Sequence, residues 1–123
     1  MERLFLISGS VLGFLSVALG AFAAHGLRER LDENSLKIFR LAVDYQFYHA
    51  FALLFLGLLV AKNDLPIFRN AGFCFLGGVT VFSGSLYALA LTQIKILGAI
   101  TPIGGSLFLV GWAMMAYGCW KGV

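Results

Sequence analysis

Four apolar stretches, each about as long as a bilayer is thick, dominate this chain of 123 residues. They cover residues 4–24, 41–61, 71–91 and 102–120. A helix needs roughly 20 apolar residues to cross a hydrocarbon core about 30 Å thick. We therefore predict an all-α integral membrane four-helix bundle, which forms a single transmembrane domain over residues 1–123.

The composition points to lipid as the surroundings of these stretches. The chain is 60% hydrophobic and 12% charged, whereas soluble domains carry roughly a quarter charged residues. A small soluble domain buries only about 60–70% of the surface that its unfolded chain exposes, so the surplus apolar surface must face lipid. The net charge is +3 and the basic residues are scattered at the ends of the apolar stretches. This distribution is typical of interfacial anchors and not of a nucleic-acid surface.

The first stretch has an alternative interpretation as a secretory signal peptide. Glu2 and Arg3 precede an apolar core, and Ala21-Phe22-Ala23 resembles a small-residue cleavage site. The uncharged run from Leu4 to Ala24 is long for a signal peptide, which favours a retained span.

The connections define two membrane faces. The second helix is expected to begin near Ser35, because Asp32 and Asn34 are good N-caps. Pro66 and Pro102 suit the first turns of the third and fourth helices. Four spans put both chain ends on one face, which also holds residues 62–66; we call it the termini face. The opposite face, which we call the loop face, holds residues 27–40 and 92–101.

The charges leave the orientation open. The positive-inside rule compares the Lys and Arg residues that flank the spans on the two faces. The termini face carries four of these cations and the loop face carries five, and a difference of one sets no orientation. The cations of the termini face are Arg3, Lys62, Arg69 and Lys121, and those of the loop face are Arg28, Arg30, Lys37, Arg40 and Lys95.

Small residues recur along two of the predicted helices. In lipid, helices associate where small side chains let their backbones approach closely. The first helix carries such residues at steps of four and three, namely Gly9, Gly13, Ser16 and Gly20, and the last helix carries Gly104, Gly111 and Gly118. We predict packing seams there, facing either a helix of the same chain or another subunit. These seams favour a homo-oligomer.

Polar residues of all four helices gather in the half of the bilayer next to the loop face. An ionisable side chain at membrane depth is a functional-site hypothesis by default. The structural alternative is that the tyrosines form an aromatic belt and that Ser83 and Thr80 bond back to their own helix. In this alternative Asp44 pairs with Arg40, and His25 and His49 are satisfied structural groups. The predicted polar set consists of His25, Asp44, Tyr45, Gln46, His49, Ser83, Tyr87 and Thr101.

The chain contains no recognisable catalytic or cofactor motif. The His, Cys and Asp spacings match no metal-site pattern, and Cys74 and Cys119 lie singly in apolar stretches. Gly104-Gly105 begins a membrane helix and lacks the flanking pattern of a nucleotide-binding loop. We predict no catalytic residue, no metal and no cofactor.

Four motifs occur in order along the chain. They are residues 20–27 (GAFAAHGL), 45–50 (YQFYHA), 83–87 (SGSLY) and 97–105 (LGAITPIGG), the last followed by Gly111-Trp112. With these motifs the chain resembles the YgdD/YwdK-like family of small bacterial membrane proteins, a family of unknown function with relatives in animals. Ala23-Ala24 departs from the small-Gly-Ala pattern expected before the histidine.

The resemblance covers essentially the whole chain. It implies a four-helix protein of the bacterial inner membrane and implies no activity. It also directs attention to the polar and aromatic residues within the motifs, which are His25, Tyr45, Gln46, His49, Ser83, Ser85, Tyr87, Thr101, Pro102 and Trp112.

Three functional hypotheses follow. The first is a structural or partner-binding module that oligomerises, alone or with an unidentified membrane protein. The second is a one-sided pocket or pathway for a small solute, a lipid or a proton, using His25, Tyr45, His49, Ser83 and Tyr87. Because the polar set stops halfway across the bilayer, this hypothesis favours a pocket over a channel. The third is an intramembrane enzyme with His25 or His49 as acid–base, for which the sequence provides no geometry.

Overall fold

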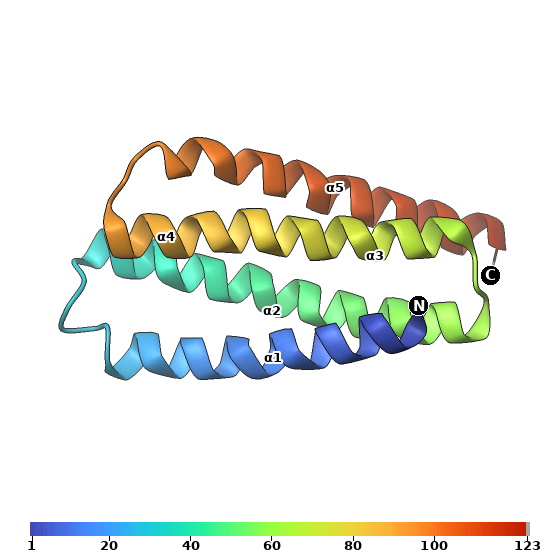
Figure 1. Cartoon of the computed structure of the whole chain (residues 1–123), viewed down its shortest axis with the longest axis horizontal. Coiled ribbons are helices and arrows are strands. Elements are labelled where there is room, and N and C mark those ends of the chain that lie inside the picture. The colour runs from blue at the N-terminus through green and yellow to red at the C-terminus, as the bar shows by residue number, and fades with distance from the viewer. Residues whose placement is uncertain (123) are drawn as a thin grey trace.

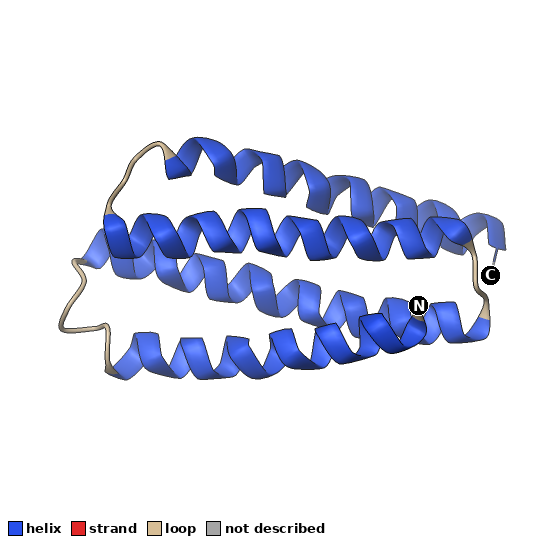
Figure 2. Ribbon diagram, in the orientation of Figure 1, coloured by secondary structure: helices blue, strands red, loops and turns tan. Residues whose placement is uncertain are grey.

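A computed structural model of the chain describes residues 1–122, which fold into four membrane-length helical rods (Figures 1 and 2). The elements are α1 (Glu2–His25), α2 (Glu33–Lys62), α3 (Pro66–Gly78), the π-helical turn η1 (Val79–Ser83), α4 (Gly84–Thr92) and α5 (Leu97–Gly122). Because α3, η1 and α4 follow one another without a break, they form one rod, Pro66–Thr92, which we call the third rod. All four rods are long and apolar enough to cross a membrane. The predicted all-α membrane fold is confirmed.

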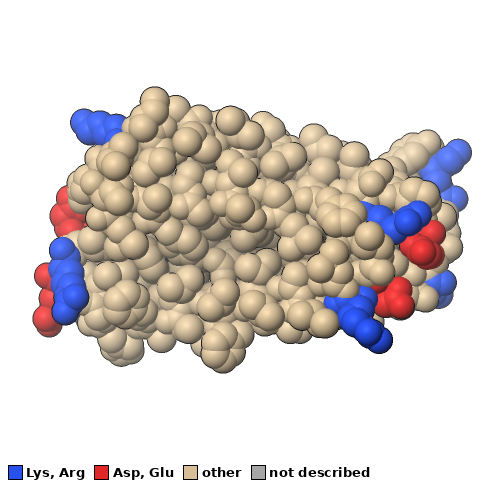
Figure 3. Space-filling view, in the orientation of Figure 1, with Lys and Arg blue, Asp and Glu red and all other residues tan. Residues whose placement is uncertain are grey.

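The two middle rods hold the bundle together. α1 packs mainly on α2, α5 packs mainly on the third rod, and α2 contacts every part of the third rod. α1 and α5 therefore lie on opposite sides of the molecule (Figure 1). Charged side chains gather at the two ends and leave a wide uncharged band between them (Figure 3). This band has the form expected of a surface that faces the hydrocarbon core.

Polar caps fix the loop-face end of α2. Asp32 is the N-cap and its Oδ1 accepts a hydrogen bond from the Ser35 backbone N–H at 2.8 Å. This bond, helped by the Ser35 side chain, holds the pKa of Asp32 below its ordinary value. Gln93 ends α4 with a left-handed φ of 64°, and its Nε2 donates to Ser35 Oγ at 2.8 Å. The end of α4 is thus tied to the start of α2.

The last helix begins earlier than the sequence suggests. Pro102 was expected to open this helix, but α5 begins at Leu97 and Pro102 lies inside it. The chain enters the helix through tight turns, in which the N–H groups of Leu97, Gly98 and Ala99 donate to carbonyls three residues earlier. The residue four positions before the proline is Gly98, which has no side chain to add to the crowding that a proline ring causes there.

Glycines of α5 receive phenylalanines of the third rod. A Cβ on Gly104 would lie 2.7 Å from Phe82 Cα, one on Gly111 would lie 2.7 Å from Phe75 Cε1, and one on Gly118 would lie 2.6 Å from Phe68 Cε1. The three glycines and the three phenylalanines each repeat every seven residues, and their helices run in opposite directions. Each phenylalanine therefore meets one glycine. The same fit occurs in reverse at Gly78, where a Cβ would lie 2.5 Å from Phe108 Cδ1. Small residues thus allow close helix packing inside this chain.

The small residues of α1 divide into two groups. A Cβ on Gly9 would lie 2.9 Å from Ala50 O, and one on Gly20 would lie 3.5 Å from Val43 Cγ1, both on α2. Ser16 is also buried. A Cβ on Gly13, by contrast, would meet nothing within 4 Å. Gly13 therefore has no steric role within the chain.

The glycine contacts of α5 make a stability prediction. We expect Gly104→Ala to destabilise the protein by about 1–3 kcal/mol, because the new methyl group meets the Phe82 backbone, which cannot rotate away. Gly105→Ala is the matched control, since a Cβ there lies 3.8 Å from the Phe82 ring, an ordinary contact. Thermal unfolding in detergent, followed by circular dichroism, measures both. Equal unfolding temperatures for the two variants would contradict the packing described.

Candidate functional site

Gln46 joins three rods through the two ends of its side-chain amide. It is buried on α2, its Nε2 donates to Leu12 O of α1 at 3.0 Å, and its Oε1 accepts from the Tyr87 hydroxyl of α4 at 2.7 Å. Ser16 Oγ also donates to Leu12 O, at 2.7 Å. The Tyr87 ring packs on Phe39 with centroids 4.9 Å apart. The amide is therefore satisfied at both ends by the chain itself.

His49 joins α2 to α5. Trp112 Nε1 donates to His49 Nε2 at 3.0 Å, and His49 Nδ1 lies 2.7 Å from Tyr45 O. An indole N–H can only donate, so Nε2 must be the unprotonated nitrogen and Nδ1 must carry the hydrogen that it donates to the carbonyl. The imidazole also stacks on Phe108, with centroids 3.6 Å apart and an interplanar angle of 10°. His49 is thus a neutral ring with both nitrogens engaged.

Two serines extend the connections of the third rod. Ser83, at the end of η1, donates to Ala42 O of α2 at 2.8 Å. The alternative in which Ser83 bonds back to its own helix is therefore wrong, whereas Thr80 does so, with Oγ1 donating to Leu76 O at 2.9 Å. Ser85 Oγ lies 2.6 Å from Thr101 Oγ1 of α5. The two serines bind helices on different sides of the third rod, one on α2 and one on α5.

The structure separates the predicted polar set into two groups. One group forms the interhelix hydrogen bonds described above and consists of Gln46, His49, Ser83, Tyr87 and Thr101. We call these residues and their bonding partners the polar network; the partners are Leu12, Ser16, Ala42, Tyr45, Ser85 and Trp112. Tyr45 contributes its carbonyl, and its ring lies 4.7 Å from that of Phe82. His25 and Asp44 are exposed and lie outside the network. The Arg40–Asp44 pair is also wrong, since the ion pair found within residues 1–122 joins Arg69 to Asp64 at 3.2 Å.

Some members of the network were not identified as site residues from the sequence. Trp112 and Ser85 were singled out only by the family resemblance. The signal for Trp112 was its indole N–H within a membrane span, where no water is present to accept a hydrogen bond. The backbone carbonyls of Leu12, Ala42 and Tyr45 leave no mark in the sequence.

The network is closed. Within residues 1–122, each of the six buried polar side chains has a hydrogen-bond partner; they are Ser16, Ser35, Gln46, His49, Ser83 and Ser85. Among residues 1–122, no group of three His, Cys, Asp or Glu side chains is arranged to hold a metal ion. The arrangement connects helices, and both ends of the Gln46 amide and both ring nitrogens of His49 are bonded to other parts of the chain.

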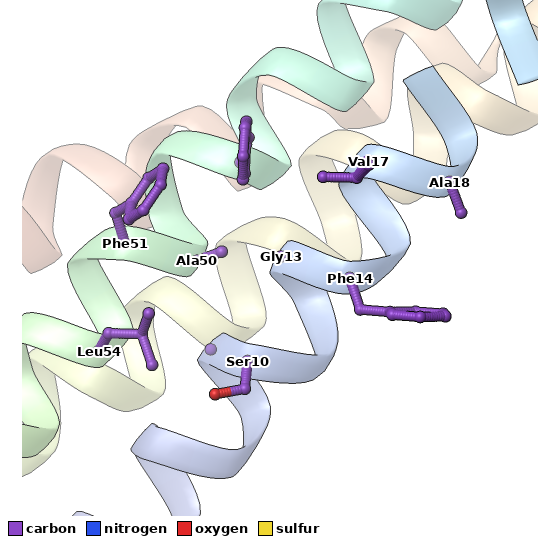
Figure 4. Close-up of a pocket in the computed structure, with 10 residues that line it drawn as sticks. Ser10, Gly13, Phe14, Val17, Ala18, Ala50, Phe51 and Leu54 are labelled. Carbon is purple, nitrogen blue, oxygen red and sulfur yellow. The ribbon is translucent and has the colours of Figure 1, made fainter. Parts of the chain in front are cut away.

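The open features lie on the lipid-facing surface. An apolar hollow of about 440 Å³ lies between α1 and α2 (Figure 4). Its lining includes Gly9, Gly13 and Val17 of α1 and Ala50 and Phe51 of α2. We call it the α1–α2 groove.

Comparison with known proteins places the chain in a family. Residues 19–105 match the family described as "Protein of unknown function (DUF423)". The chain belongs to the DUF423 family. A UPF0382 membrane protein of Staphylococcus haemolyticus is 46% identical over 119 residues, which is 97% of each chain. UPF0382 membrane protein YwdK of Bacillus subtilis is 41% identical over 92% of this chain and 93% of its own.

These findings confirm the resemblance seen in the motifs and establish a multi-pass membrane protein of unknown function. No solved structure matches this DUF423 chain.

The Gln46–Tyr87 bond can be measured by a double-mutant cycle. We expect Tyr87→Phe and Gln46→Leu to show a coupling energy of about 0.6 kcal/mol and at most about 1.7 kcal/mol, the values typical of hydrogen bonds between membrane helices. Unfolding equilibria in bicelles provide the four free energies. Tyr48→Phe is the matched control, because Tyr48 is an exposed tyrosine of α2, two residues after Gln46. Zero coupling, with Tyr87→Phe as neutral as Tyr48→Phe, would contradict this bond.

Proposed function

We propose that this DUF423 protein is a non-catalytic module of the bacterial cytoplasmic membrane that acts by self-association through the α1–α2 groove. The observation that carries the proposal is the free space at Gly13, a glycine in the middle of a membrane span with nothing within 4 Å of its Cβ position. A glycine that is not needed inside the chain allows another helix to approach from outside.

The groove suits a helix more than a polar ligand. Its walls are apolar apart from Ser10, whose hydroxyl donates to Leu6 O of its own helix at 2.8 Å. It lies at the middle of α1, where Gly9 and Gly13 have no side chains and the helix backbone lines the groove beside Val17. A polar solute would have only the Ser10 side chain to bind there, and that hydroxyl already donates to its own helix.

A second copy of the chain fits this surface. In a two-fold dimer the same patch is used by both copies, so a projecting side chain next to a hollow on one copy can fill the hollow of the other. Phe14 lies at the edge of the groove, is 75% exposed and points away from α2 (Figure 4). α1 is also the least buried of the four spans, since 17% of its most apolar 18-residue segment is buried, against 50% for the corresponding segment of α2. It therefore has the most surface available for a partner.

The polar network supports the structural part of this proposal. A pathway for protons or solutes needs groups that can exchange partners, whereas Gln46 and His49 are bonded at both ends. We infer that the network fixes the positions of α1 and α2 and so fixes the shape of the groove between them.

Cysteine cross-linking in native membranes tests the self-association. In a chain whose Cys74 and Cys119 are replaced by Ser, we expect Gly13→Cys to form a disulfide-linked dimer on mild oxidation, because a two-fold contact brings equivalent groove residues together. Val11→Cys is the matched control, since it lies at nearly the same depth, is 50% exposed and does not line the groove. Non-reducing electrophoresis provides the readout.

Equal cross-linking of both variants would indicate random collision. A monomeric Gly13→Cys chain would show that this groove is not the contact between copies. Either result would overturn the proposal of self-association through the groove.

A further inference from the structure

A charged hollow lies on α2 at the loop face. Its volume is about 570 Å³, and the charged side chains that line it are Glu33, Lys37, Arg40 and Asp44. Leu36 and Leu41 contribute apolar surface. These residues occupy the first three turns of α2, where the helix leaves the apolar band.

A second hollow lies deeper, between α2 and α5. Its volume is about 350 Å³, and its walls include Tyr48, Phe51 and Phe55 of α2 and Trp112 and Met115 of α5. The Trp112 N–H is already donated to His49, so the exposed part of the indole presents apolar ring surface. This hollow suits hydrocarbon.

The two hollows lie in line along one face of α2. Lys37, Leu41, Asp44, Tyr48, Phe51 and Phe55 follow one another at steps of four and three, which places them on one side of the helix, and all six are exposed. From Arg40, at the headgroup end, to Phe55 the helix rises about 22 Å at 1.5 Å per residue, which is close to half of a bilayer about 40–45 Å thick with its headgroup regions. This strip therefore has the length of one lipid leaflet.

We propose that this strip binds one phospholipid whose headgroup carries both a phosphate and a protonated primary amine. Lys37 and Arg40 bind the phosphate through charge-assisted hydrogen bonds, and Glu33, one turn farther from the membrane centre, accepts from the amine. An acyl chain then runs past Leu41 and Tyr48 into the hollow at Phe55 and Trp112.

The charges select this headgroup. The hollow contains two cations and two carboxylates, so its net charge is zero and a lipid with a net negative charge gains little there. A zwitterion can pair with both kinds of group. A quaternary ammonium headgroup has no N–H to donate to Glu33. A helix of another chain would bury Lys37 and Arg40 against apolar side chains, at a cost that a phosphate avoids.

The site meets the self-association groove at Phe51, which lines both hollows. The proposed headgroup contacts at Glu33, Lys37 and Arg40 lie outside the groove. Because lipid selection is tested at these residues and self-association at Gly13, the two proposals can fail independently.

Native mass spectrometry of the full chain tests the lipid site. The protein is mixed in detergent with equal amounts of phosphatidylethanolamine, phosphatidylglycerol and phosphatidylcholine that carry identical acyl chains. We expect phosphatidylethanolamine to be the lipid retained. The double variant Lys37→Gln/Arg40→Gln should retain it about 25-fold less well, or about fivefold for each basic residue near a membrane surface. Glu33→Gln should lose the preference over phosphatidylcholine.

The control removes the same charge elsewhere. Lys62→Gln/Lys95→Gln changes two exposed cations outside the strip, and we expect lipid retention to stay as in the parent chain. Circular dichroism checks that all variants keep their helix content.

Three outcomes would overturn the proposal: equal retention of the three lipids, unchanged retention in the Lys37→Gln/Arg40→Gln variant, or displacement of the lipid by soluble phosphoethanolamine, which has no acyl chain.

Discussion

The lack of water in the bilayer core is the constraint on which this structure depends. A polar group placed there must find its partner within the protein, and Gln46 and His49 both lie on a membrane span. Gln46 binds Leu12 O and Tyr87, while His49 binds Tyr45 O and Trp112. These few bonds reach all four rods and select one arrangement among the many that apolar surfaces alone would allow.

Two pairs of rods are each held together by close packing and by hydrogen bonds. The third rod and α5 meet through glycines and phenylalanines at matching steps of seven, as at Gly111 and Phe75, and through the Ser85–Thr101 contact. α1 and α2 meet through Gly9, Gly20 and the Gln46 bond to Leu12 O. The features proposed for binding therefore lie on the outer surface, between α1 and α2 and between α2 and α5.

The sequence predicted the fold because the length of an apolar run and the bilayer thickness determine it almost alone. The predicted polar set was less accurate because depth was used without angular position. Asp44 and Gln46 are two residues apart, so they point to nearly opposite sides of α2, and Asp44 is exposed while Gln46 is buried. The acceptors Leu12 O and Ala42 O could not be predicted, since every residue has a carbonyl and only the packed helices show which one a side chain reaches.

The most direct test of a closed network is the hydrogen position on His49 in a lipid bilayer. Solid-state ¹⁵N nuclear magnetic resonance of labelled histidine and tryptophan, assigned with a His49→Phe variant, distinguishes protonated from unprotonated ring nitrogens. At neutral pH we predict a single neutral species with hydrogen on Nδ1 and an unprotonated Nε2 that accepts from the Trp112 indole N–H. A doubly protonated ring, or an Nε2 that bears the hydrogen and shows no contact with Trp112, would contradict the closed network and reopen His49 as a site for ligand or proton binding.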